Sequence, residues 1–419
     1  MTAYVDQGVR PSDQEVPVSS ESHRLEVVTR PKDRRAQIIA HAAELFWRDG
    51  YDGVTVADVA SSVGIAASAV YRHVPGKQAL LIEPIREMVM AWYASALVAV
   101  DGGKDPAERL SRLVTAVVVV AVDRPAVVGL WHREARHLPE EVRNELVAVR
   151  GRTVDLWSAC LIELDPTLRP PDAEFRIRAA LGLLNSVALL TKAVSRRRTL
   201  AHFEHLMTGV ILSAQLSGSP IAPDSPLSHH EVEVEQDPGR REVLLRAGAR
   251  LFRERGYHRV GIDDIGEAVG IRGPSIYGHF ISKSDVLYEL LTRMADLLDA
   301  ALATADDVTN PQAAVERLAG EYVRLSLNDR DLLAVYVTEM QHLPADRLAV
   351  LHQRRRARAR RWTSLLVLAR PDLDDRAARI TVLATLEMIF AVARSRRWED
   401  ESFLDQRLEQ LALTALLRH

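Results

Sequence analysis

Hydrophobic residues recur at helical spacing through most of this chain. The first stripe predicts a helix with one apolar face, made of Ile38, Ile39, Ala42, Leu45 and Phe46. Later stretches at 179–194 and 377–393 are long and nearly uncharged, which is typical of buried helices. The valines at 117–120 favour a strand by their branching, but their neighbours read as helix, so we expect a buried helix there. The pattern predicts an all-α fold.

The same pattern occurs twice. The stripe that ends at Phe46 returns as Leu244, Leu245, Gly248, Leu251 and Phe252, displaced by 206 residues. Further along, His137-Leu138-Pro139 returns as His342-Leu343-Pro344, now displaced by 205. One residue was therefore lost or gained between the two matching regions. A repeat of this length predicts two copies of one two-part protein.

Two segments lack the helical pattern. Residues 1–30 are polar and contain Pro11 and Pro17, which predicts a disordered tail. Residues 217–239 combine Pro, Gly and Ser with acidic residues and fall between the copies, which predicts a linker. His229-His230 in the linker has no Cys or acidic partner at ligand spacing, so we expect neither a metal site nor a cofactor.

Composition narrows the class of protein. At 419 residues the chain is too long for one core. A net charge of -3 gives no general attraction to nucleic acid, so any such binding must come from local patches. The single Cys160 excludes an internal disulfide and fits a reducing compartment. No secretion signal or bilayer-length apolar run is visible, so we expect a cytoplasmic protein with no membrane contact.

Each copy contains a short helix, a turn with glycine, and a second short helix. The turns are Val63-Gly64-Ile65 and Val269-Gly270-Ile271. Each glycine lies where a chain leaving a helix needs a positive φ angle. Thr55 with Asp58 predicts an N-cap before the first of these helices, and Ser282 with Asp285 predicts another further along. This order is that of a helix-turn-helix.

The second helix of each motif carries donors suited to DNA. Tyr, His and Lys side chains suit phosphate oxygens, whereas Arg72 and Arg272 are candidates for guanine. Gly261 replaces Thr55 in the second copy, which removes a side-chain cap. Because Arg72 is matched by Gly278, and Arg272 by Ala66, we expect the two copies to read different bases of an asymmetric operator. The candidate DNA-binding residues are Thr55, Ala67, Ser68, Tyr71, Arg72, His73, Lys77, Arg272, Gly273, Ser275, Tyr277, His279 and Lys283.

These motifs resemble the TetR family of bacterial regulators. The second copy matches the family signature with Tyr277, His279, Phe280, Lys283 and Leu287, and the first has Val74 in place of Phe. The resemblance implies helix-turn-helix domains at 31–82 and 240–288, and helical regulatory domains at 83–216 and 289–419. In the family, the last two long helices pair with a second subunit in a four-helix bundle. Here 178–194 with 206–216, and 380–394 with 403–417, would supply both pairs.

Two assemblies agree with that implication. Two half-bundles in one chain can satisfy each other, which makes an intramolecular pseudo-dimer and places the recognition helices about one DNA turn apart. The alternative is a homodimer of tandem chains with four DNA-binding units.

The regulatory domains would hold a hydrophobic small molecule. Each candidate residue named below would also suit a position in the hydrophobic core. Asn185 of the first copy is matched by Phe390 of the second, so we expect two pockets that differ in polarity, one of them filled. Glu387 is either paired or functional, and the six arginines within 354–361 form either a solvated surface or a site for an anionic group. The candidate ligand-binding residues are Trp92, Trp131, His132, Trp157, Asn185, Tyr322, Tyr336, Met340, Trp362, Met388 and Phe390.

The leading interpretation is a repressor that a lipid-like effector releases from double-stranded DNA, with a role in lipid metabolism. A DNA-binding enzyme would need a nucleophile with clustered acids, and no such arrangement is visible. A ligand-independent activator or a structural DNA-binding protein is the alternative, and the sequence does not separate it from a repressor.

Overall fold

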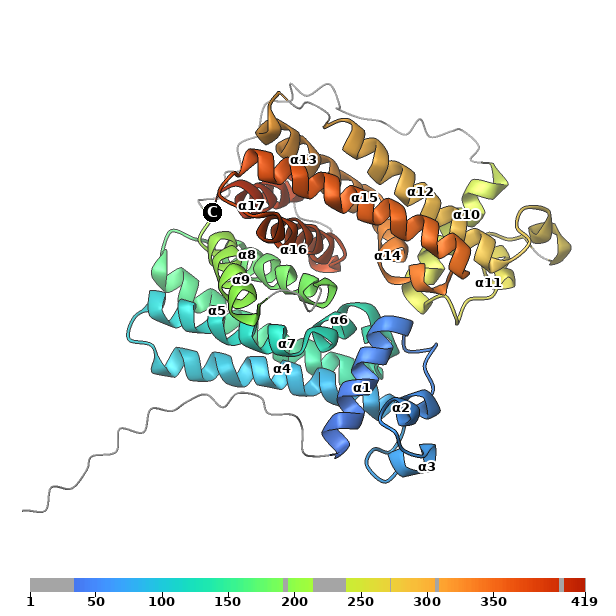
Figure 1. The fold of residues 1–419 in the computed structure, drawn as a ribbon, viewed down its shortest axis with the longest axis horizontal. Coiled ribbons are helices and arrows are strands. Elements are labelled where there is room, and N and C mark those ends of the chain that lie inside the picture. The colour runs from blue at the N-terminus through green and yellow to red at the C-terminus, as the bar shows by residue number, and fades with distance from the viewer. Residues whose placement is uncertain are drawn as a thin grey trace, which may run out of the picture.

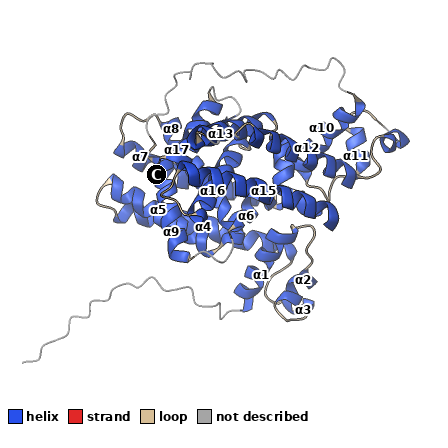
Figure 2. Ribbon diagram, turned by 45° about the horizontal axis from the view of Figure 1, so that its top comes forward, coloured by secondary structure: helices blue, strands red, loops and turns tan. Residues whose placement is uncertain are grey.

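The computed structural model describes residues 34–190, 195–213, 239–271, 273–305, 309–398 and 403–418. The regular structure of these residues is helical, with no strand among them (Figure 2). The predicted all-α class is confirmed, and so is its division into two tandem modules. The first copy comprises the described residues up to 213, and the second copy those from 239 onward.

The two copies present the same order of helices (Figure 1). In the first copy these are α1 (Arg34–Asp49), α2 (Val56–Ser62), α3 (Ala67–Val70), α4 (Lys77–Gly102), α5 (Pro106–Asp123), α6 (Pro125–Glu134), η1 (Ala135–His137), α7 (Glu140–Leu164), α8 (Pro170–Leu183), η2 (Leu184–Leu189) and α9 (Arg196–Ile211). In the second copy they are α10 (Arg240–Arg255), α11 (Ile262–Glu267), η3 (Gly273–Gly278), α12 (Lys283–Ala303), α13 (Pro311–Asn328), α14 (Arg330–Thr338), η4 (Met340–His342), α15 (Ala345–Ala369), α16 (Asp375–Ala393), η5 (Arg396–Trp398) and α17 (Leu404–Leu417).

Local signals in the sequence set several helix ends. Thr55 and Asp58 form the predicted capping box, and the Ser282 hydroxyl accepts from the amide of Asp285 as predicted. Gly64 and Gly270 have φ angles of 70° and 75°, in the left-handed region that favours glycine. The valines at 117–120 lie inside α5, so the helical interpretation is confirmed.

The last helices of the two copies pack together. α8 and α9 lie against α16 and α17 near the centre of the molecule. Gly182 on α8 allows a close approach, because a Cβ there would lie 3.1 Å from the Cα of Met388. The Arg407 guanidinium donates across this interface to the Asp172 carboxylate at 2.6 Å, and His202 contacts Thr381 at 2.9 Å. These contacts join the copies into one body.

One helix is shorter than expected. The pattern predicted a continuous helix to residue 194, but α8 ends at Leu183 and tightens into the 3-10 helix η2. Residues 191–194 lie outside the described part, as do the predicted tail (1–30) and most of the predicted linker. In the second copy the matching helix α16 runs unbroken to Ala393.

Within the described residues, no single helix has the length and apolar character needed to cross a membrane. Helix α5 reaches this length and apolar character only when it is taken together with α6 and η1, and the chain bends by 89° between them.

Candidate nucleic-acid interface and ligand cavity

The first helix-turn-helix exposes the residues that the sequence selected. Beneath the short α3, Val70 and Val74 are buried and fix its orientation against α1 and α2. Thr55, Ala67, Ser68 and Arg72 are exposed, and so is the Tyr71 side chain, at 58%. His73 is half-buried. The predicted residues therefore share one accessible end of the molecule.

The second helix-turn-helix has the same frame but a different recognition segment. Instead of an α-helix, residues Gly273–Gly278 form the 3-10 helix η3, because two glycines and a proline in this segment are poor α-helix formers. Tyr277 is 51% exposed, Ser275 is exposed, and His279 is half-buried. Arg272 lies outside the described residues, and Gly273 is described only in its backbone.

The two lysines of the motif lie closer to the protein than a purely phosphate-binding role implies. Lys77 lies over the Tyr51 ring, with its Nζ 4.3 Å from the ring centroid, and Lys283 lies over the Tyr257 ring at 4.4 Å. The Lys283 ammonium also donates to the carbonyls of Tyr257 and Val260, at 2.9 and 3.1 Å. Burial lowers the pKa of both lysines. Lys283 therefore holds the loop before α11 and has one donor left for other partners.

A cavity of about 690 Å³ opens in the first copy. It brings together four of the predicted ligand-binding residues, Trp92, Trp131, His132 and Trp157. The sequence interpretation missed its positive charge, since only separate helices that meet in space create it. The arginines that line the cavity are Arg133, Arg136, Arg143, Arg150, Arg178, Arg253 and Arg394.

The His132 imidazole is neutral in this cavity. The Arg394 guanidinium donates to both the His132 carbonyl and its Nδ1, the latter at 2.8 Å. Burial, with repulsion from Arg394 and Arg150, lowers the pKa of His132 well below its ordinary value. An unprotonated Nδ1 can accept the hydrogen bond that Arg394 supplies.

The matching cavity of the second copy is smaller, at about 250 Å³. Asn185, Met340 and Phe390 line it, together with Glu387 and Arg355. The remaining candidates, Tyr322, Tyr336, Trp362 and Met388, line neither cavity; the last three are buried, so here the core interpretation fits better. The repeat explains the loss of volume, because larger side chains replace Val117, Thr153 and Gly182, namely Tyr322, Arg358 and Glu387.

Part of the arginine cluster on α15 has a structural role. The buried Arg358 guanidinium donates to the Tyr336 hydroxyl and, at 2.5 Å, to the Asp299 carboxylate. Arg354 pairs with Asp296 and Asp299, each at 2.6 Å. For these two arginines, neither a solvated surface nor an open anion site is correct, because carboxylates from α12 already neutralise them.

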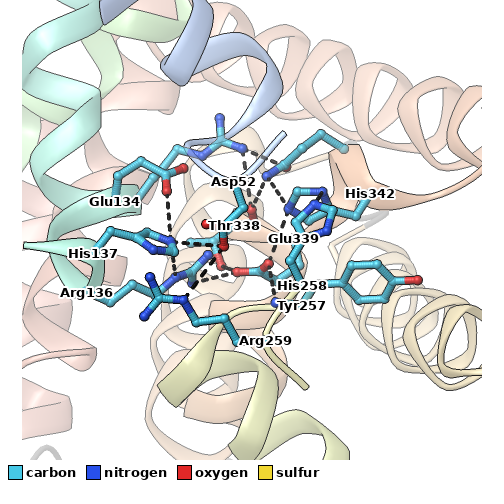
Figure 3. A network of polar contacts seen from close by, with 12 residues as sticks. Asp52, Glu134, Arg136, His137, Tyr257, His258, Arg259, Thr338, Glu339 and His342 are labelled. Atoms are coloured by element: carbon cyan, nitrogen blue, oxygen red, sulfur yellow. Dashed lines mark hydrogen bonds and ion pairs between the residues drawn. The ribbon is translucent and has the colours of Figure 1, made fainter. Parts of the chain in front are cut away.

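A network of polar contacts, which we call the junction network, joins the DNA-binding units to both regulatory domains (Figure 3). The Glu339 carboxylate, fully buried, accepts from the Arg136 guanidinium at 2.6 Å and from the Tyr257 amide at 3.2 Å. The residues labelled in the figure are Asp52, Glu134, Arg136, His137, Tyr257, His258, Arg259, Thr338, Glu339 and His342. Glu339 therefore links an arginine of the first copy to the DNA-binding unit of the second.

The junction network is only partly symmetric. Tyr51 stacks near His137 with ring centroids 5.0 Å apart, and Tyr257 stacks on His342 at 5.4 Å. Burial opposes ionisation of Glu339, yet Arg136, His342 and hydrogen bonds hold the pKa of its carboxyl below the ordinary value. Burial prevails at the equivalent Glu134 and raises the pKa of that carboxyl. The pKa values of these two equivalent carboxyls are therefore shifted in opposite directions.

Family comparisons match both copies. The profile of "Bacterial regulatory proteins, tetR family" matches residues 38–83 and 244–290. A second profile, "Tetracyclin repressor-like, C-terminal domain", matches residues 103–189 and 308–395.

Several individual proteins with similar sequences are named as transcription regulators. The HTH-type transcriptional repressor KstR2 of Mycobacterium tuberculosis (strain ATCC 25618 / H37Rv) is 31% identical over 146 residues, which cover 32% of this chain and 72% of that protein. The HTH-type transcriptional activator FasR of Mycolicibacterium smegmatis is 38% identical over 82 residues, which cover 18% and 37%. The solved structure of the ketosteroid transcriptional regulator KstR2 has 26% sequence identity and a TM-score of 0.38, covering 43% of this chain and 95% of its own.

Proposed function

Because the chain belongs to the TetR family of bacterial regulatory proteins, we propose that this DNA-binding transcription regulator is a repressor of an asymmetric operator. The observation that carries the proposal is the pair of unequal recognition segments, α3 and η3, each with an exposed tyrosine. Arg72 in the first segment has Gly278 as its counterpart in the second, so the half-sites differ in at least one base.

Footprinting of the full-length chain on DNA upstream of its own gene tests this proposal. We expect one protected site whose two halves differ in sequence. In the Arg72→Ala variant, discrimination at one base position of one half-site is lost, since an arginine–guanine contact contributes about 1 to 3 kcal/mol. A palindromic site, or an equal effect of Arg72→Ala on both halves, would contradict an asymmetric operator.

We infer further that the chain acts as an intramolecular pseudo-dimer. In support, α8 and α9 pack against α16 and α17 within one chain, and these are the helices that form the subunit bundle in the resemblance described above. The two helix-turn-helix units also lie toward the same side of the molecule (Figure 1). A single chain then presents both recognition segments to one stretch of duplex.

The effector we propose is a hydrophobic, lipid-like molecule that enters the cavity of the first copy. Three tryptophans provide the apolar surface, and the second cavity is too reduced to accept an equivalent ligand. Arg136 lines the first cavity and also pairs with Glu339 in the junction network. Ligand binding therefore shifts the population between DNA-competent and DNA-incompetent spacings of the two units.

An activator is the second candidate function, because FasR, which is similar over the region it matches, carries that name. A transcription reporter in cells lacking the gene separates the two: a rise in expression of neighbouring genes indicates a repressor, and a fall indicates an activator.

A further inference from the structure

The lining of the first cavity contains more positive than negative charge. Three of its arginines have carboxylate partners: Arg136 pairs with Glu339 and Arg178 with Glu174, each at 2.6 Å, and Arg253 pairs with Asp331 at 2.9 Å. The guanidinium groups of Arg150 and Arg143 form no ion pair or hydrogen bond with any described residue, and of the two it is Arg150 that lies over the cavity tryptophans Trp92 and Trp131. Arg394 directs its donors to His132 rather than to a carboxylate.

Both guanidiniums remain charged despite their surroundings. Burial lowers the pKa of Arg150 to about 10, and repulsion from Arg178 and Arg394 contributes. Burial also lowers the pKa of Arg394 to about 10, while attraction from Glu387 acts in the opposite direction. The Arg150 guanidinium lies over the Trp131 ring at 4.7 Å, and such a contact offsets only part of the cost of removing a cation from water. The cavity therefore contains positive charge in unfavourable surroundings, which an anion would neutralise.

The rest of the cavity wall is suited to an apolar chain. Trp92 and Trp157 line it with Leu113, Val117 and Val154. Trp92 is only 7% exposed, and its indole Nε1 has no hydrogen-bond partner among the described residues. A volume near 690 Å³ lies within the range of cavities that enclose whole small ligands.

The second copy provides an internal comparison. Arg355 occupies the position of Arg150 in the repeat, and Glu387 occupies the position of Gly182. Arg355 and Glu387 line the same small cavity, and although burial raises the pKa of the Glu387 carboxyl, attraction from Arg355 opposes that shift, so the second copy supplies its own acidic group for its arginine. In the first copy Gly182 supplies none. Among the described residues, the one acidic residue that lines the first cavity is Glu254, which contacts Arg253 at 3.3 Å.

We propose that the first cavity binds an amphipathic anion, with its carboxylate or phosphate group held by Arg150 and Arg394 and its apolar chain lying against the tryptophans. The inference rests on the proposed function and specifies the chemical class of the effector. Within this cavity the ligand's anionic group takes the part that Glu387 has in the second copy.

Binding of simple amphiphiles to the full-length chain tests the inference. The probes are decanoate, decyl phosphate and the neutral decanol, and the readouts are calorimetry and the fluorescence of the cavity tryptophans. We expect at least one anion to bind about tenfold or more tightly than decanol, roughly the effect of one charge-assisted hydrogen bond. Comparison of decanoate with decyl phosphate identifies the preferred head group. Equal affinity for decanol and both anions in the unaltered chain overturns the inference without any need for a variant.

Substitution of the unpaired arginine gives a second test. Arg150→Met should weaken anion binding about tenfold while leaving decanol binding unchanged. The matched control is Arg355→Met, which removes the equivalent arginine of the second copy and should leave anion affinity as it was. A loss of anion binding in both variants alike, or in neither, contradicts the assignment.

The proposed function and this inference can fail separately. If the chain protects an operator but binds anions no better than decanol, the DNA-binding proposal holds and the anion inference fails. If the chain binds anions selectively but protects no DNA, the anion inference holds and the DNA-binding proposal fails.

Discussion

Arg136 and Gln341 occupy the same position of the repeat, but their side chains contact different parts of the molecule. Arg136 lines the open cavity and pairs with Glu339 of the other copy. A Cβ at Gly256 would lie 3.0 Å from its Nε, so the arginine also lies against the turn between α10 and α11 in the second DNA-binding unit. Gln341 accepts instead from Arg133 at 2.6 Å. A single side chain therefore connects the cavity to the second DNA-binding unit.

Arg136→Gln, which installs the residue of the second copy, should uncouple the two events. The effector still binds, because Arg150 and Arg394 remain, but it no longer releases the DNA. Calorimetry with the effector and a DNA-retention assay with and without it would measure the two separately. Glu339→Gln should have the same effect, because it removes the other partner of the Arg136–Glu339 ion pair. If the effector still releases the DNA in both variants, this ion pair does not couple the cavity to DNA binding.

Buried histidines predict a specific response to acid. Burial lowers the pKa of His342 to about 4; Glu339 acts in the opposite direction, while His258, Arg136 and Arg133 add repulsion. The unfolded chain takes up this proton near pH 6.5, and the folded chain does so only near pH 4. Folding stability should therefore fall as the pH drops from about 6.5 to 4, by at most about 1.4 kcal/mol per pH unit for each such histidine.

The melting temperature across this range checks the prediction. His342→Asn should flatten the slope, and His41→Asn, at an exposed position, is the matched control. His137 and His202 should contribute in the same sense, because burial lowers the pKa of each to about 4. A slope that His342→Asn leaves unaltered would count against a neutral His342.

At the scale of elements, α2 and α11 differ by one cap. The Thr55 side chain accepts from the amide of Asp58 at 3.2 Å. Gly261 has no side chain to do so, although the Asp264 carboxylate still accepts from its amide at 2.6 Å. Helix α2 therefore begins with both halves of the capping box, and α11 begins with one.

Replacing the cap should affect each helix alone. Thr55→Ala should destabilise α2 by about 1 kcal/mol, and Gly261→Ser should stabilise α11 by a few tenths of a kcal/mol. The backbone of Gly261, with φ of -86° and ψ of 164°, suits serine without strain. Hydrogen exchange of the amides of each helix would show the local change. Exchange that shifts equally in both helices after either substitution would mean that the caps do not act locally.

Most of these elements were predictable from the sequence because their signals are local. Thr55, Gly64 and Ser282 mark their own helix ends, and the displaced repeat revealed two modules. The cavity was not predictable in the same way. Trp157 lines it while its counterpart Trp362 does not, because Val117, Thr153 and Gly182 leave space that Tyr322, Arg358 and Glu387 fill. The sequence signal that could have revealed the larger cavity was the difference in side-chain size between these matched residues of the two copies. The cationic lining needs Arg150 of α7 and Arg394 at the end of α16, which belong to different copies and meet only at this cavity.

At the scale of the whole molecule, one chain supplies both halves of its central helical bundle. The bundle buries Gly182 against Met388 and pairs Arg407 with Asp172, so α8 and α16 already cover each other. We therefore expect a particle mass near 46.6 kDa by light scattering, both in concentrated and in diluted solutions of the chain. A mass near twice this value would support the homodimer of tandem chains instead.

Glu387 has one more consequence, for the dose–response curve. A symmetric dimer offers two equivalent effector sites, and occupancy of one can favour occupancy of the other. Here the Glu387 side chain is a permanent part of one site, which leaves one variable site for two recognition segments. Release from the operator should thus follow a simple hyperbola with a Hill coefficient near 1, measurable by fluorescence anisotropy of labelled operator. Such a regulator responds gradually over a wide range of effector concentration and does not act as a sharp threshold.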